Sequence, residues 1–150
     1  MFRIRRRHRV LGAFLFVLYL FGLAYFLFFA EALGRAADIG PRSVNLTPFL
    51  EIRRFWNYRG QVGMKAFFLN TAGNVLAFVP FGFFMPLTVR PRRGLIGSLL
   101  GGAAFSLAIE TVQFLTSSGS FDVDDIILNT CGSVLGYILF RICFSRQGSQ

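Results

Sequence analysis

The sequence predicts an all-α integral membrane protein, a bundle of four transmembrane helices with an outer segment between the first two. Of its 150 residues, 54% are hydrophobic and 17% are aromatic, which is more apolar side chain than a soluble domain of this length can bury. The apolar residues form four runs, each about 19 to 22 residues long and able to cross roughly 30 Å of hydrocarbon as a helix. Most of the charged residues lie between these runs.

The first predicted helix covers Val10–Ala30 and follows the basic stretch "RIRRRHR". A basic stretch before an apolar run is also how a secretory signal peptide begins. This apolar run is about twice the usual length of a signal-peptide core, so we expect an uncleaved membrane anchor.

The outer segment contains "NLTPFLEIRRFWNYR". Thr47 can cap a short helix that begins at Pro48, with large apolar residues on one side of it and arginines on the other. A helix of this kind suits the membrane–water interface. Residues 46–59 could equally fold back over the bundle as a lid, and the pattern does not separate these two arrangements.

The other three helices are predicted at Ala66–Leu87, Leu95–Leu115 and Ile126–Phe144, and the last two should form a hairpin. Each helix of this hairpin carries glycines four residues apart, Gly97 and Gly101 in one and Gly132 and Gly136 in the other. Small residues let helix backbones approach closely in a membrane. We therefore expect the two glycine stripes to face each other, and residues 1–150 to form a single transmembrane domain.

The basic residues predict the orientation. Ten of them fall on the side of the two chain ends, and the other six all fall in the long loop between the first and second helices. Short cytoplasmic loops are rich in Arg and Lys, whereas long loops cross the membrane with less regard for charge. Both termini should therefore be cytoplasmic. Since orientation accounts for the net charge of +9, no nucleic-acid partner is expected.

Polar side chains gather in the outer third of three predicted helices. They are Asn70 and Asn74 near the start of the second helix, Glu110 and Gln113 near the end of the third, and Asn129 near the start of the fourth. Residues three or four apart share a helix face, and an isolated carboxylate is strongly disfavoured in lipid. We therefore expect these side chains to meet inside the bundle, with Arg42 or Arg59 of the outer loop as a counter-charge to Glu110.

Three carboxylates, Asp122, Asp124 and Asp125, stand at the start of the fourth helix. Free backbone N–H groups and the helix dipole stabilise carboxylates there, but repulsion makes three harder to explain than one. A structural role, a cation site, a basic partner and contact with a ligand head group all remain open. We expect Asp122 and Asp125 to matter more than Asp124, because Asp125 shares a helix face with Asn129 and Asp124 is turned about 100° away.

The sequence predicts no cofactor and no metal site. His8 is the only histidine, and no phosphate-binding glycine loop is present. A binding protein is therefore favoured over an enzyme. The alternative is an intramembrane hydrolase or transferase, metal-dependent or not, that would use Glu110 and the aspartates on a lipid-linked head group. A transporter or channel is disfavoured, because Arg141, near the inner end of the last span, is the only charge in the inner half of the four spans.

Four motifs occur in order along most of the chain. They are "NLTPF" (Asn45–Phe49), "GNVLAFVPFGF" (Gly73–Phe83), "ETVQF" (Glu110–Phe114) and "DVDDIILNTCGSVLGY" (Asp122–Tyr137). Together they resemble the VanZ-like family of small multi-span membrane proteins, named for a teicoplanin-resistance protein. Many relatives carry an arginine shortly before the aspartates, where this chain has "TSSGS", and we expect Arg42 to take its place.

The resemblance implies a multi-pass protein of the bacterial cytoplasmic membrane, linked to teicoplanin-type resistance or to cell-envelope homeostasis. An outward-facing polar pocket would bind an amphiphilic ligand or a partner protein. The expected partners are the lipid bilayer and a lipid-linked cell-wall precursor or a lipoglycopeptide. The candidate site residues are Arg42, Asn45, Asn70, Asn74, Glu110, Gln113, Asp122, Asp125 and Asn129.

Overall fold

Four long helices dominate the computed structural model, which describes residues 6–34, 44–50, 53, 64–88, 94–116 and 119–145. The helices are α1 (Arg6–Gly34), α3 (Met64–Thr88), α4 (Gly94–Thr116) and α5 (Val123–Ser145), and two short strands, β1 (Val44–Asn45) and β2 (Phe121–Asp122), accompany them. All four helices are long and apolar enough to cross a membrane, and each contains one of the predicted spans. The prediction of an all-α, four-helix membrane bundle is confirmed.

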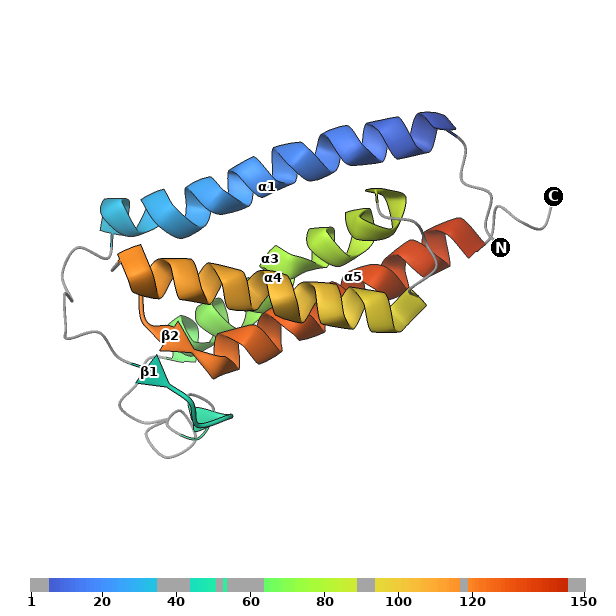
Figure 1. Cartoon of the computed structure of the whole chain (residues 1–150). Helices are drawn as coiled ribbons and strands as arrows, with labels where there is room; N and C mark the ends of the chain where they lie inside the picture. Colours follow the sequence, from blue (N-terminus) through green and yellow to red (C-terminus); the bar gives the residue numbers. More distant parts are fainter. Residues whose placement is uncertain are drawn as a thin grey trace.

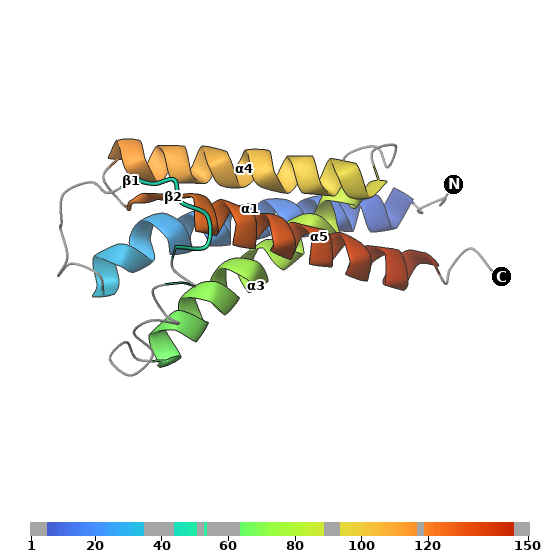
Figure 2. The same cartoon turned by 90° about the horizontal axis from the view of Figure 1, so that it is seen from below.

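The helices run alternately in opposite directions along the bundle (Figure 1). The start of α1 and the end of α5 therefore lie at one end, whereas β1 and β2 lie at the other (Figures 1 and 2). Helix α5 packs against both α3 and α4, and α1 packs against α3. Two ends with different chemistry result, a basic end at Arg6 and a polar end at the strands.

The closest helix approach is between α3 and α5. A Cβ built on Gly136 would lie 2.0 Å from the Val79 carbonyl oxygen, and one on Gly132 would lie 2.1 Å from the Val75 carbonyl oxygen. The expectation that this stripe faces the glycines of α4 is therefore wrong. Helices that follow each other in the chain, as α4 and α5 do, need not make the closest contact. Helix α3 also contributes a glycine to its contact with α5, because a Cβ on Gly82 would lie 1.8 Å from the Ser133 carbonyl oxygen.

Helices α4 and α5 are joined by a pair of buried serines. The Ser98 hydroxyl donates to the Ser133 carbonyl oxygen over 3.0 Å, and the Ser133 hydroxyl donates to the Ser98 carbonyl oxygen over 3.1 Å. Both side chains are almost fully buried. Gly102 makes room for this contact, because a Cβ there would lie 2.6 Å from the Ser133 Cβ. Small polar residues thus fasten α4 to α5 where no hydrophobic effect can do so.

Aromatic side chains fill the space between α1, α3 and α4. Phe81 of α3 stacks on Phe105 of α4 with ring centroids 4.7 Å apart, and Phe16 of α1 lies 5.6 Å from Phe81. Large apolar side chains elsewhere on the four helices are exposed, as expected of surfaces that face lipid. The packed interior is therefore narrow, and the bilayer covers the rest.

The outer segment differs in detail from the prediction. The Thr47 N–H donates to the Asn45 side-chain oxygen over 3.0 Å, and Phe49 has a φ of 63°, which is not a helical conformation. Leu50 is the first helical residue of this segment, so the expected helix cannot begin at Pro48. Most of residues 46–59 lie outside the described part of the chain, and the choice between a lid and an interfacial helix stays a prediction.

Candidate polar site at the strand end of the bundle

A two-stranded parallel pairing joins the outer segment to the start of α5. Val44 pairs with Phe121, and Asn45 pairs with Asp122. Parallel strands need a long crossover between them, and here α3 and α4 both lie in that crossover. The pairing places the "NLTPF" segment beside the "DVDD" segment.

Asp122 holds both the outer segment and the first turn of α5. Its side-chain oxygen accepts hydrogen bonds from the Asn45 amide at 2.9 Å and from the Asp124 backbone N–H at 2.8 Å. The second bond is an N-cap, which satisfies a backbone donor that the helix leaves free. Asp122 is half-buried, so its carboxylate is partly shielded from water.

Asp124 faces the outer segment rather than the bundle interior. Its carboxylate accepts a hydrogen bond from the Phe49 backbone N–H, and its side chain is only 4% exposed. Asp124 is not among the predicted site residues, because it does not share a helix face with Asn129. Helix rotation shows which residues share a face, but not what lies against the other faces.

The remaining two acids connect three helices. Asp125 of α5 accepts a hydrogen bond from the Asn74 amide of α3. Glu110 of α4 is 3% exposed and accepts one from the Asp122 backbone N–H at 3.1 Å. Both contacts are made with residues at the start of α5, since Asp122 directly precedes this helix and Asp125 lies in its first turn.

We refer to Glu110, Asp122, Asp124 and Asp125 as the carboxylate cluster. Its carboxylates accept hydrogen bonds from α3, from the start of α5 and from the outer segment. Of the polar residues expected to meet Glu110 inside the bundle, Asn74 bonds to this cluster, and Asn45 of the outer segment bonds to it as well. Whether the cluster acts in function stays a prediction.

Asn129 lies one helical turn beyond Asp125 and is 5% exposed. Its amide donates to the Ser106 hydroxyl over 2.9 Å, and Ser106 lies one turn from Glu110 on α4. The Asn129 side-chain oxygen is buried and has no hydrogen-bond partner in the described part of the structure. Leaving a buried acceptor without a hydrogen bond costs about 1–3 kcal/mol of stability. A donor from a water molecule or a ligand at this oxygen would remove that cost. Ser106 was missed, although its spacing of four from Glu110 could have indicated it.

Other candidate residues are not placed in the cluster. Gln113 is half-buried, and no hydrogen bond of its amide is seen within the described ranges. Arg42, Arg59 and the side chain of Asn70 lie outside the described residues, so the counter-charge to Glu110 stays a prediction. Across the residues that the structure describes, no group of three His, Cys, Asp or Glu side chains is placed to hold a metal ion.

Comparisons with known proteins bear on this site. The family model described as VanZ/LLP1 matches residues 16–144. A curated relative, Protein VanZ of Enterococcus faecium, is 31% identical over 101 residues, which cover 67% of this chain and 54% of the relative. The chain thus spans about half the length of that curated relative. No solved structure matches the chain.

Proposed function

Because the chain belongs to the VanZ/LLP1 family, we propose that it contributes to resistance against teicoplanin-type glycopeptides and lipoglycopeptides, or to the cell-envelope homeostasis behind that resistance. In this proposal it lies in the bacterial cytoplasmic membrane with both termini in the cytoplasm. The strand end of the bundle then faces outward, where these antibiotics act on cell-wall precursors. The protein would act there by binding an amphiphilic ligand or a partner protein.

The carboxylate cluster is the observation that supports this proposal. Three helices and the outer segment hold its acids in one place through hydrogen bonds, and a binding site needs side chains that are fixed in this way. Ionised carboxylates only accept hydrogen bonds. A suitable partner is therefore rich in hydroxyl, amide or ammonium donors, as the head group of a lipid-linked cell-wall precursor or a lipoglycopeptide is.

Apolar side chains border the cluster on the outer segment. Val44, Leu46 and Phe49 are all more than half exposed, and each lies within four residues of Asn45, which bonds to Asp122. A polar group next to exposed apolar side chains matches an amphiphile, with a polar head and a hydrocarbon tail. The carboxylate cluster and the exposed apolar side chains beside it therefore both support an amphiphilic ligand.

Glu110 provides the test. A bacterial host that expresses Glu110→Ala should lose the resistance to teicoplanin that the unaltered protein provides, because the buried group that anchors the Asp122 backbone is gone. Glu110→Gln should keep part of it, since an amide oxygen can still accept that hydrogen bond. The measurement is the minimum inhibitory concentration of teicoplanin, with the membrane level of each variant checked by immunoblot.

Thr111→Ala is the matched control. Thr111 is exposed, and its hydroxyl bonds only to the Leu107 carbonyl oxygen of its own helix, so this variant should retain resistance. Unchanged resistance from Glu110→Ala at normal abundance would rule out a functional role for the cluster.

A further inference from the structure

The end of the bundle opposite the carboxylate cluster has basic residues without acidic ones. No Asp or Glu precedes Glu31, none lies between residues 52 and 109, and none follows Asp125. Ten arginines occupy the N-terminal stretch, the connection between α3 and α4, and the C-terminal stretch. The acidic residues that the structure describes all lie toward the strand end, so Arg6, Arg7 and Arg9 at the start of α1 can take a counter-charge from another molecule.

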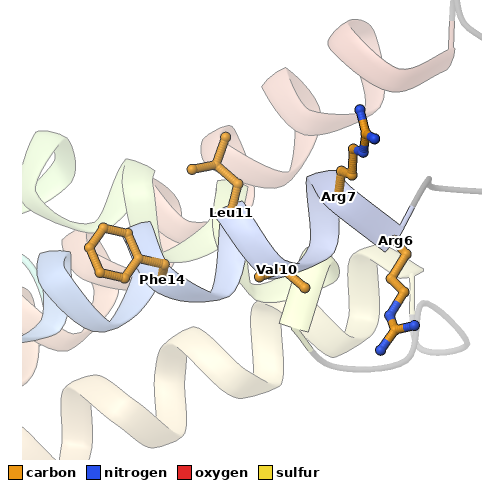
Figure 3. Close-up of a pocket in the computed structure, with 5 residues that line it drawn as sticks. All are labelled: Arg6, Arg7, Val10, Leu11 and Phe14. Carbon is orange, nitrogen blue, oxygen red and sulfur yellow. The ribbon is translucent and has the colours of Figure 1, made fainter.

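Two of these arginines border a hollow on α1. It has a volume of about 690 Å³ and is lined by Arg6, Arg7, Val10, Leu11 and Phe14. Figure 3 shows the two arginines at the end of the helix, on opposite sides of the ribbon, and the three apolar side chains farther along it. At about 100° per residue, the five positions span roughly 140° around the helix axis and about 12 Å of its length, so the hollow is a broad strip along α1.

The order of side chains along the hollow is the order of groups in a lipid. The arginines stand at the end of the span, at the level of the head groups, and the apolar side chains follow at the level of the hydrocarbon. All five are exposed, so the bundle itself does not cover them. Guanidinium groups bind phosphate with paired hydrogen bonds, and basic groups next to a span attract anionic lipids.

We propose that this hollow binds one anionic phospholipid of the leaflet at that end. Its phosphate binds at the end of the helix that carries Arg6 and Arg7, and an acyl chain lies along Val10, Leu11 and Phe14. A lipid with net negative charge is favoured over a zwitterionic one, because Arg6 and Arg7 both carry positive charge and no acidic residue occurs on α1 before Glu31. The proposal does not depend on the function proposed above, since the hollow lies at the other end of the bundle.

The test compares lipids and arginines in the purified full-length protein. Native mass spectrometry in detergent should show one retained phosphatidylglycerol, and phosphatidylcholine with the same acyl chains should bind at least about tenfold more weakly. The double variant Arg6→Gln/Arg7→Gln should bind phosphatidylglycerol about tenfold or more weakly, the loss expected for two basic groups beside an anionic lipid. Arg9→Gln, an exposed arginine of α1 that does not line the hollow, should stay within about twofold.

A second pair of variants tests the acyl chain. Leu11→Ser lies in the hollow and should weaken the binding of phosphatidylglycerol, whereas Val17→Ser, exposed on the same helix beyond the hollow, should not. Equal losses in the Arg9 and Arg6/Arg7 variants would overturn the proposal in favour of general charge attraction. If glycerol 3-phosphate displaces the lipid at equal concentration, the apolar side chains play no part in binding. If phosphatidylglycerol and phosphatidylcholine bind equally well, the net charge of the lipid plays no part.

Discussion

Three acids of the carboxylate cluster accept hydrogen bonds from three different parts of the chain, and Asp122 adds a second bond to the outer segment through Asn45. Asp124 holds the outer segment at Phe49, Asp125 holds α3 at Asn74, and Glu110 holds the start of α5 at Asp122. Hydrogen bonds to charged groups contribute about 1.5–3 kcal/mol each. Removing one acid should therefore release one part of the structure and leave the others in place.

Asp124→Ala should release the outer segment. The Phe49 N–H loses its acceptor, so a cysteine placed at the exposed Leu46 should react faster with maleimide or be cut nearby by a protease, and the free energy of unfolding should fall by about 1.5–3 kcal/mol. Asp125→Ala is the matched comparison, because it should loosen α3 and leave this segment protected. Identical protease patterns for Asp124→Ala and the unaltered protein would contradict the contact.

Part of this site could be predicted from residue spacing. The burial of Glu110 and the approach of Asn74, Asp125 and Asn129 follow from the cost of polar groups in lipid and from shared helix faces. The role of Asp124 could not be predicted in this way. Its donor is a backbone N–H in a loop, and a backbone donor has no residue type that a sequence pattern could show.

At the scale of helices, packing depends on which backbones can come closest. The α5 glycines face carbonyl oxygens of α3, whereas α4 is fastened to α5 by the Ser98–Ser133 pair. The glycine spacing correctly marked α5 as a helix with a smooth face. It could not indicate the partner, because α3 and α4 both offer small residues and only the three-dimensional crossing decides between them.

Gly136→Ala should destabilise the bundle. The new methyl group would lie 2.0 Å from the Val79 carbonyl oxygen, and a backbone atom cannot move aside as a flexible side chain can. We expect a loss of about 1–3 kcal/mol, typical of overpacking, measured by thermal unfolding in detergent.

Gly73→Ala on α3 is the control. A Cβ there meets nothing within 4 Å, and alanine favours a helix over glycine by about 1 kcal/mol, so its stability should be equal or slightly higher. Equal destabilisation by both variants would show that the close approach of α3 and α5 is not what the glycine provides.

At the scale of the whole molecule, the bundle separates its charges. The carboxylate cluster lies at the strand end, and α1 begins with arginines at the other. The four spans could be predicted because each transmembrane helix must satisfy its own backbone hydrogen bonds and therefore needs a full-length apolar run. The pairing of β1 with β2 could not, because two residues in each strand are too few to form a pattern.

The distribution of arginines predicts which end is outside. In a variant with Cys131 and Cys143 replaced by alanine, a membrane-impermeant maleimide added to whole cells should label Ser120→Cys but not Thr88→Cys. Both positions are exposed in the structure, and they lie at opposite ends of the bundle. Labelling of Thr88→Cys alone would reverse the orientation and place the carboxylate cluster in the cytoplasm.

The pairing of β1 with β2 also sets an order for biogenesis. Asn45 and Asp122 are 77 positions apart, and α5, the last helix along the chain, begins directly after β2. While the ribosome has delivered only the first three spans, Glu110 sits in the membrane without the N–H of Asp122, and Asn74 without the carboxylate of Asp125. These hydrogen bonds to the start of α5 can form only after the last helix has entered the membrane. A nascent chain that stops before α5 therefore leaves the Glu110 side chain in the membrane without this backbone hydrogen bond, and the last helix supplies it.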